Sequence, residues 1–117
     1  TNTPLQALVT LNDPQFTEAA RNLAQRMIKE GGQTAQERVT YGYRLVAARQ
    51  PKAIVANILV AAYNEELENF KKNTEAADKL LNVGESKRDE NINNAEHAAW
   101  TIVASMLLNL DEVITRL

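Results

Sequence analysis

Residues 95–110, AEHAAWTIVASMLLNL, are the most apolar stretch of the chain and decide its fold class. Apolar residues recur there every three or four positions on two faces, one through Ile102 and the other through Trp100. A helix that is apolar over most of its girth belongs in the interior of a helical bundle. The stretch therefore predicts a buried central helix that continues to at least Leu108.

Polar residues occur in this helix at every fourth position, as His97, Thr101, Ser105 and Asn109. This spacing places them in one line along the helix. Asn109 and Glu112 also have the spacing of a helix-capping pair, so the helix is expected to break there.

Helical spacing extends over the rest of the chain, and strand signals are nearly absent. Asp13 followed by Pro14 is a helix-start signal, and Thr34 with Glu37 forms a capping box. The further helices are expected at about 4–11, 14–30, 35–50, 51–72 and 75–83, with a polar exposed loop at 85–94. The pattern predicts an all-α fold, an antiparallel bundle of five to six helices with the 95–110 helix central, and one domain over residues 1–117.

Periodicity also assigns sides to these helices. In the 14–30 helix Ala19 belongs to the apolar face, whereas Arg21 lies opposite it. Gly42 and Leu45 are expected on the inner side of the following helix. Because glycine inside a helix costs roughly 0.5–1 kcal/mol relative to alanine, another helix should touch Gly42.

Composition and charge exclude several functional classes. The chain lacks cysteine, which excludes disulfides, thiolate metal sites and covalent c-type haem within it. The net charge of −2 argues against nucleic acid as a partner. Residues 1–58 carry seven Lys and Arg against four Asp and Glu, and residues 59–117 carry six against eleven. The apolar stretch is shorter than the roughly 20 residues of a membrane span, so no span is expected.

Enzyme motifs are absent from the sequence, and a single histidine cannot form a histidine metal cluster. His97 is expected to be a surface or hydrogen-bonded residue without a catalytic role. Glu65, Glu66 and Glu68 are expected on a solvated face. No catalytic residue, cofactor or metal is therefore expected in this chain.

A partial calcium-loop pattern begins at Asp89 and continues through Asn91 and Asn93. Asn94 then stands where that loop needs glycine, and Trp100 where it needs glutamate. The pattern favours an asparagine-rich helix entry over a calcium site.

The chain opens on TNTPLQALVTLND (residues 1–13), with no initiator methionine or leader. We expect the chain to be the C-terminal fragment of a larger multidomain protein. The expected short helix carries apolar residues on more than one face, so self-association through residues 1–12 is also expected. These apolar residues are Leu5, Leu8, Val9 and Leu11.

Four segments carry a family resemblance in order and spacing. They are TNTPLQALVTLNDPQF (1–16), ERVTYGYRLVAARQP (37–51), LLNVGESKRDENIN (80–93) and AAWTIVASMLLNLDEVITR (98–116). The chain resembles the C-terminal part of the domain of unknown function 1553 family, the planctomycete cytochrome-associated domain. The resemblance implies a large exported bacterial protein, located in the periplasm or at the cell surface, whose upstream domains are the partners of this one.

Two functional hypotheses remain. In the first, the chain is a non-catalytic helical module with an interaction or structural role. In the second, it completes an enzyme active site together with a missing upstream domain. The binding candidates for the second are Asn2, Asn12, Asn109, Asp111 and Glu112. Convergence of these side chains in one cleft would favour the second hypothesis, and separate helix-capping roles would favour the first.

Overall fold

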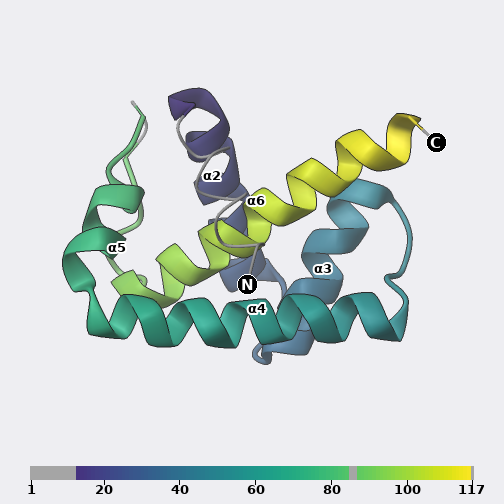
Figure 1. Ribbon diagram of the computed structural model, residues 1–117, viewed down its shortest axis with the longest axis horizontal. Coiled ribbons are helices and arrows are strands. Elements are labelled where there is room, and N and C mark those ends of the chain that lie inside the picture. Colours follow the sequence, from purple (N-terminus) through teal and green to yellow (C-terminus); the bar gives the residue numbers. More distant parts are fainter. Residues whose placement is uncertain (1–12, 85–86, 117) are drawn as a thin grey trace.

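The computed structural model describes residues 13–84 and 87–116, and within the last helix it describes residues 111–116 by their backbone only. The described residues form helices and no strand (Figure 1). The helices are α2 (Pro14–Glu30), α3 (Ala35–Ala47), α4 (Ala53–Lys72), α5 (Thr74–Leu81) and α6 (Asn94–Arg116). The predicted helix at 4–11 lies outside the described residues.

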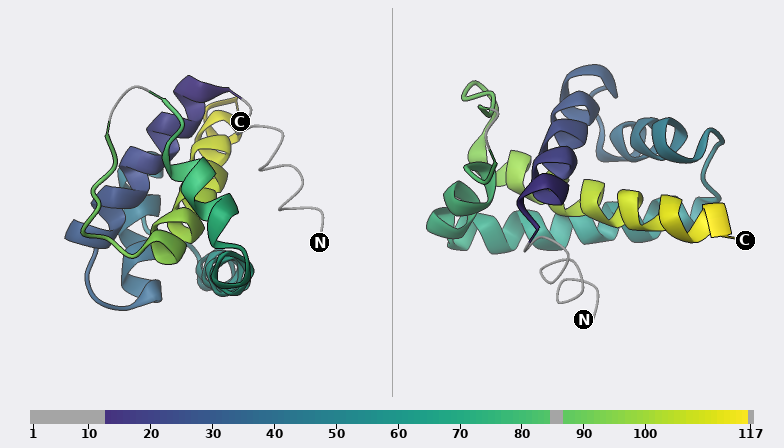
Figure 2. Two further views of the ribbon diagram at one scale, coloured as in Figure 1. Left: turned by 90° about the vertical axis from the view of Figure 1, so that its left-hand side faces the viewer. Right: turned by 90° about the horizontal axis from the view of Figure 1, so that it is seen from above.

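Helix α6 is the centre of the fold, as its apolar girth predicts. It contacts α2, α3, α4 and α5. Helices α4 and α6 run antiparallel, and α2 crosses them steeply (Figures 1 and 2). The predicted break near Asn109 is wrong, because α6 continues to Arg116. A mid-helix asparagine costs only a fraction of a kcal/mol, about 0.7 at most, and the apolar repeat continues beyond it. Among the described residues, no helix has the length and hydropathy that a membrane crossing requires.

Local sequence signals set the starts of three helices. The Asp13 carboxylate accepts hydrogen bonds from the backbone N–H groups of Gln15 and Phe16 at the start of α2. Thr34 and Glu37 form the predicted capping box of α3. Helix α5 begins one residue earlier than expected, because the side chain of Asn73 provides its N-cap. These short-range contacts satisfy backbone donors that the first helical turn leaves unpaired.

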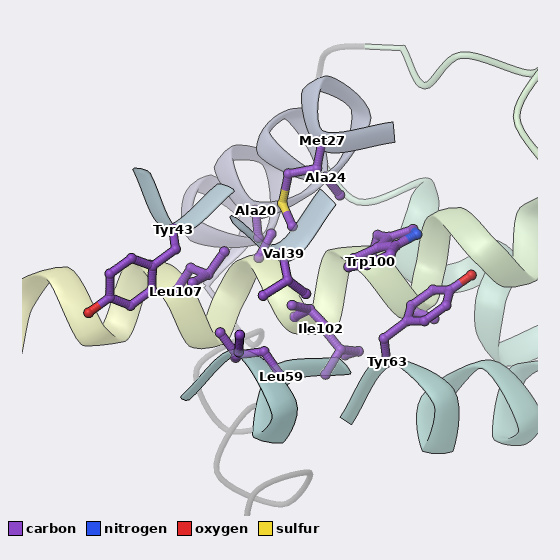
Figure 3. Close-up of a cluster of buried hydrophobic side chains, with 14 residues drawn as sticks. Ala20, Ala24, Met27, Val39, Tyr43, Leu59, Tyr63, Trp100, Ile102 and Leu107 are labelled. Atoms are coloured by element: carbon purple, nitrogen blue, oxygen red, sulfur yellow. The ribbon is translucent and has the colours of Figure 1, made fainter. Parts of the chain in front are cut away.

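The core is built from aliphatic side chains of four helices around two stacked aromatic rings (Figure 3). The rings of Tyr63 and Trp100 lie 3.9 Å apart between centroids, with 17° between their planes. Gly42 is buried, and a methyl group there would approach Met27 and Leu107 to within 2.7 and 2.9 Å. The prediction that another helix touches Gly42 is confirmed. This ring stacking and the close packing hold α2, α3, α4 and α6 around one interior.

Three assignments of sides are wrong. Ala19 is exposed, Arg21 is completely buried, and Leu45 is 41% exposed. On α3 the inner side is formed by Val39, Gly42 and Tyr43, so Leu45 lies off that face. On α2 the chain after α5 covers the side that carries Arg21, which no periodicity within α2 could indicate.

A candidate functional site where α2 meets the α5–α6 connection

The sequence-predicted binding residues are only partly described by the structure. Asn2 and Asn12 lie outside the described residues. Asp111 and Glu112 belong to the last turns of α6, of which the backbone alone is described, and Asn109 is half-buried on the same helix. Their convergence in one cleft therefore stays a prediction. The polar groups that the described structure does bring together lie elsewhere, between α2 and the connection from α5 to α6.

Arg21 is the centre of this polar junction. Its side chain is completely buried, and its Nη1 donates to the backbone carbonyls of Leu81, at 2.9 Å, and Val83, at 2.6 Å. Its Nη2 lies 3.7 Å from the carboxylate of Glu18. The carbonyls at the end of a helix lack donors within it and carry partial negative charge, so a cation is stabilised there. Arg21 thus fixes the end of α5 to α2.

The connection after α5 follows the surface of α2 closely. Gly84 adopts φ +94°, a left-handed conformation, and a Cβ there would lie 2.8 Å from the Glu18 carboxylate. Both the torsion and the lack of space require glycine. Farther along, Lys29 of α2 forms an ion pair with Asp89. This pairing, followed by the Asn91 N–H, lowers the pKa of Asp89 below its usual range.

A second set of contacts closes the connection against α5. The Asn94 side chain donates to the carboxylate of Asp78 on α5 and accepts from the guanidinium of Arg88. Four positions of the predicted exposed loop are half-buried, so the prediction is wrong at Arg88, Asp89, Ile92 and Asn94. The sequence does not indicate Arg88 and Asp89 because their partners lie on other helices.

The asparagine-rich entry to α6 contains a helix cap. The Asn93 side chain accepts a hydrogen bond from the Glu96 N–H at 3.0 Å, and the Asp89 carboxylate is occupied by Lys29 and by the Asn91 N–H. Across the described parts of the chain, no group of three or more His, Cys, Asp or Glu side chains is arranged to hold a metal ion.

His97 lies beneath this junction and is completely buried. Its Nε2 is 3.4 Å from the backbone oxygen of Arg21. Burial is the main cause that lowers the pKa of His97, and the nearby charges of Arg21 and Arg88 lower it further, whereas Asp89 raises it. The imidazole is therefore neutral at pH 7 and closed to solvent. His97 is thus the hydrogen-bonded residue that the sequence allows and not a surface residue.

In the polar line of α6, Thr101 and Ser105 are buried like His97, whereas Asn109 is half-buried; the two hydroxyl groups are satisfied within the helix. Thr101 Oγ1 donates to the backbone oxygen of His97 at 2.8 Å, and Ser105 Oγ donates to that of Ile102 at 2.5 Å. Such back-bonding lets small hydroxyl side chains occupy a helix interior without outside partners. The line is thus a way to pack polar residues inside the bundle.

Glu66 is a further buried polar group that the sequence analysis placed wrongly on a solvated face. It is 8% exposed, and the Asn69 amide donates to its Oε1 at 3.5 Å. Burial raises the pKa of this carboxyl. Leu59, Tyr63 and Glu66 are spaced by four and three residues, so the periodicity of α4 itself could have placed Glu66 inward.

A polar hollow of about 600 Å³ lies on the outer side of the junction. Its lining residues include Asn82, Gly84, Lys87, Arg88 and Glu90. It is mixed in charge, and two of its charged lining residues, Arg88 and Asp89, pair with Asn94 and Lys29 outside the lining. Its described lining residues include no Ser, Thr or Cys that a base could activate as a nucleophile.

The fold and the junction define a small helical domain in which polar contacts join α2 to the end of α5 and to the connection that follows it. A family model described as "Protein of unknown function (DUF1553)" matches residues 1–63, and the chain belongs to this family. No curated protein and no solved structure matches the chain.

Proposed function

We propose that this chain is a non-catalytic helical module with an interaction or structural role in a larger bacterial protein of the cytochrome-associated type. One observation carries the proposal: the buried polar side chains of the described bundle either contact backbone groups of a neighbouring element, as Arg21 and His97 do, or bond within their own helix, as Thr101 and Ser105 do. The guanidinium of Arg21 binds the backbone carbonyl of Leu81 at the end of α5, and the imidazole of His97 is buried away from solvent. A general base must reach the proton that it abstracts, and a completely buried ring does not.

The partners in this proposal are the upstream domains of the same polypeptide. Contact between two copies through residues 1–12 is a second way in which the module could assemble. In either role it needs no cofactor of its own. Export to the periplasm or cell surface is part of the proposal and is supported by the family resemblance alone.

Association with the upstream region tests the proposal. The region that precedes this chain in the full-length protein would be produced separately, and its binding to this chain measured by isothermal titration calorimetry and sedimentation. We expect a defined complex of the two. Absence of any association, with both parts folded by circular dichroism, would contradict the interaction role.

A second experiment separates this proposal from the enzyme alternative. Asn2, Asn12, Asn109, Asp111 and Glu112 would be replaced together by alanine in the full-length protein. We expect any turnover that the full-length protein shows to survive. Loss of turnover while association with the upstream region persists would favour an active site shared between the two parts.

A further inference from the structure

The outer side of α4 carries an apolar ridge that no described element covers. Ile54 and Ile58 are 68% and 57% exposed and lie four residues apart, hence on the same side of the helix. Ala61, also exposed, follows three residues later on this side. In the left panel of Figure 2, α4 is seen end-on, with the other described helices on one side of it. Large aliphatic side chains exposed together mark a contact surface.

The ridge begins in a positively charged region. Between Glu37 and Glu65 the sequence has four cationic residues and no carboxylate. Two of these cations, Arg49 and Lys52, directly precede α4, and both are exposed. Neither forms an ion pair with a carboxylate of the described residues. The amino end of α4 adds positive potential of its own.

We propose that this surface, the α4 ridge of Ile54, Ile58 and Ala61 with the cations Arg49 and Lys52, docks an amphipathic helix that bears carboxylates beside its apolar face. The inference rests on the proposed interaction role and specifies its surface. Side chains spaced by four and three residues form the ridge that packs into the groove of another helix. The small Ala61 lets that helix approach closely, and the cations pair with its carboxylates at the edge.

A protein helix fits this surface better than a lipid membrane does. Interfacial helices combine a long apolar face with many cations on the polar side. Here the apolar face has two large residues, and the same side of α4 continues into the carboxylate of Glu65. That carboxylate would oppose an anionic lipid surface, whereas it can lie beyond the end of a docked helix.

The probe is a fluorescent synthetic helix of about 18 residues, with leucines on one face and glutamates beside them. A matched peptide has lysine in place of each glutamate. Fluorescence anisotropy should show binding of the acidic peptide to this chain, and binding of the lysine peptide weaker by about tenfold or more. Raising the salt concentration should weaken the acidic complex, because its charged contacts lie at the rim.

Substitutions on the ridge decide whether binding occurs there. Ile58→Ser should weaken binding of the acidic peptide about tenfold, and the double variant Arg49→Glu, Lys52→Glu should abolish the preference for acidic over basic peptide. Lys72→Glu reverses a single charge at the opposite end of α4 and should leave binding intact. All four positions are exposed, so circular dichroism should show unchanged folding.

Several results would overturn the proposal. These are failure of the acidic peptide to bind, equal binding by Ile58→Ser, or binding to phosphatidylglycerol vesicles in place of the peptide. Binding of the upstream region to the original chain and to Ile58→Ser distinguishes failure of this proposal from failure of the proposed function. If the region binds Ile58→Ser as tightly as the original chain, the interaction role stands and the ridge is not its surface. If it binds neither chain, the interaction role itself fails.

Discussion

Replacement of Arg21 by methionine should lower the free energy of unfolding by about 3 kcal/mol. The change removes two charge-assisted hydrogen bonds, to the carbonyls of Leu81 and Val83, worth roughly 2 kcal/mol each. Burial of the apolar methionine side chain recovers about 1 kcal/mol. For a chain of this size, a loss of that amount lowers the melting temperature by about 12 °C.

Two measurements test this expectation. Thermal unfolding followed by circular dichroism gives the change in stability, and hydrogen exchange followed by mass spectrometry locates it. Exchange should rise most in the segment 82–93, because Arg21 fixes its beginning to α2. Arg26→Met is the matched control: Arg26 is an exposed arginine on the same helix whose contacts with Glu30 and the Tyr41 hydroxyl lie at the surface, and its loss should change little.

The reasoning is refuted if Arg21→Met melts within about 2 °C of the original chain. It is also refuted if exchange rises elsewhere but not in the segment 82–93. Arg21→Lys provides a graded check. A lysine keeps the charge but has a single donor centre, so we expect a stability between those of the original chain and the methionine variant.

Three further expectations concern buried positions. Folding lowers the pKa of His97, so acid favours the unfolded state. The free energy of unfolding should therefore fall as the pH drops below about 6.5. His97→Gln removes the sole histidine, and urea unfolding should then show a weaker dependence of stability on pH between about pH 7.5 and 5.5. The pKa of Glu66 is raised, so its charged form opposes folding; Glu66→Gln should raise the melting temperature at pH 7 but not at pH 4, and an equal rise at both would contradict this. Gly42→Ala should lower stability by about 1 kcal/mol in urea titrations, since crowding against Met27 and Leu107 outweighs the gain in helix propensity; higher stability would show that close contact is not the reason for glycine.

The parts of the fold predicted from the sequence are those determined by near neighbours. The cap at Asp13 and the capping box at Thr34 involve residues within three positions, so their patterns are complete in the sequence. The central place of α6 follows from its apolar girth. Arg21, by contrast, was assigned to the outside because its partners lie 60 and 62 residues away. The same is true of Asp89, whose partner Lys29 belongs to another helix.

The candidate site shows the same division more sharply. Asn109 and its neighbours are binding candidates because they lie in a family motif, and their role stays a prediction. The buried junction around Arg21 has no local signature, since an arginine between two alanine-rich turns is the usual pattern of a solvated helix side. Glu66 is different, because its inward position follows from the spacing within α4 and was missed only because neighbouring glutamates led to a surface assignment.

The central position of α6 has a consequence for how the chain can be divided. The family model ends at residue 63, yet the core side chains of α2, α3 and α4 pack against α6, which begins at residue 94. A truncated chain that stops at residue 63 would leave Met27, Val39 and Leu59 without the helix that covers them. Such a piece should collapse without cooperative unfolding and should aggregate. The segment recognisable by its sequence is thus smaller than the unit that must fold together, and cloning boundaries for this family are better drawn after the last turn of α6.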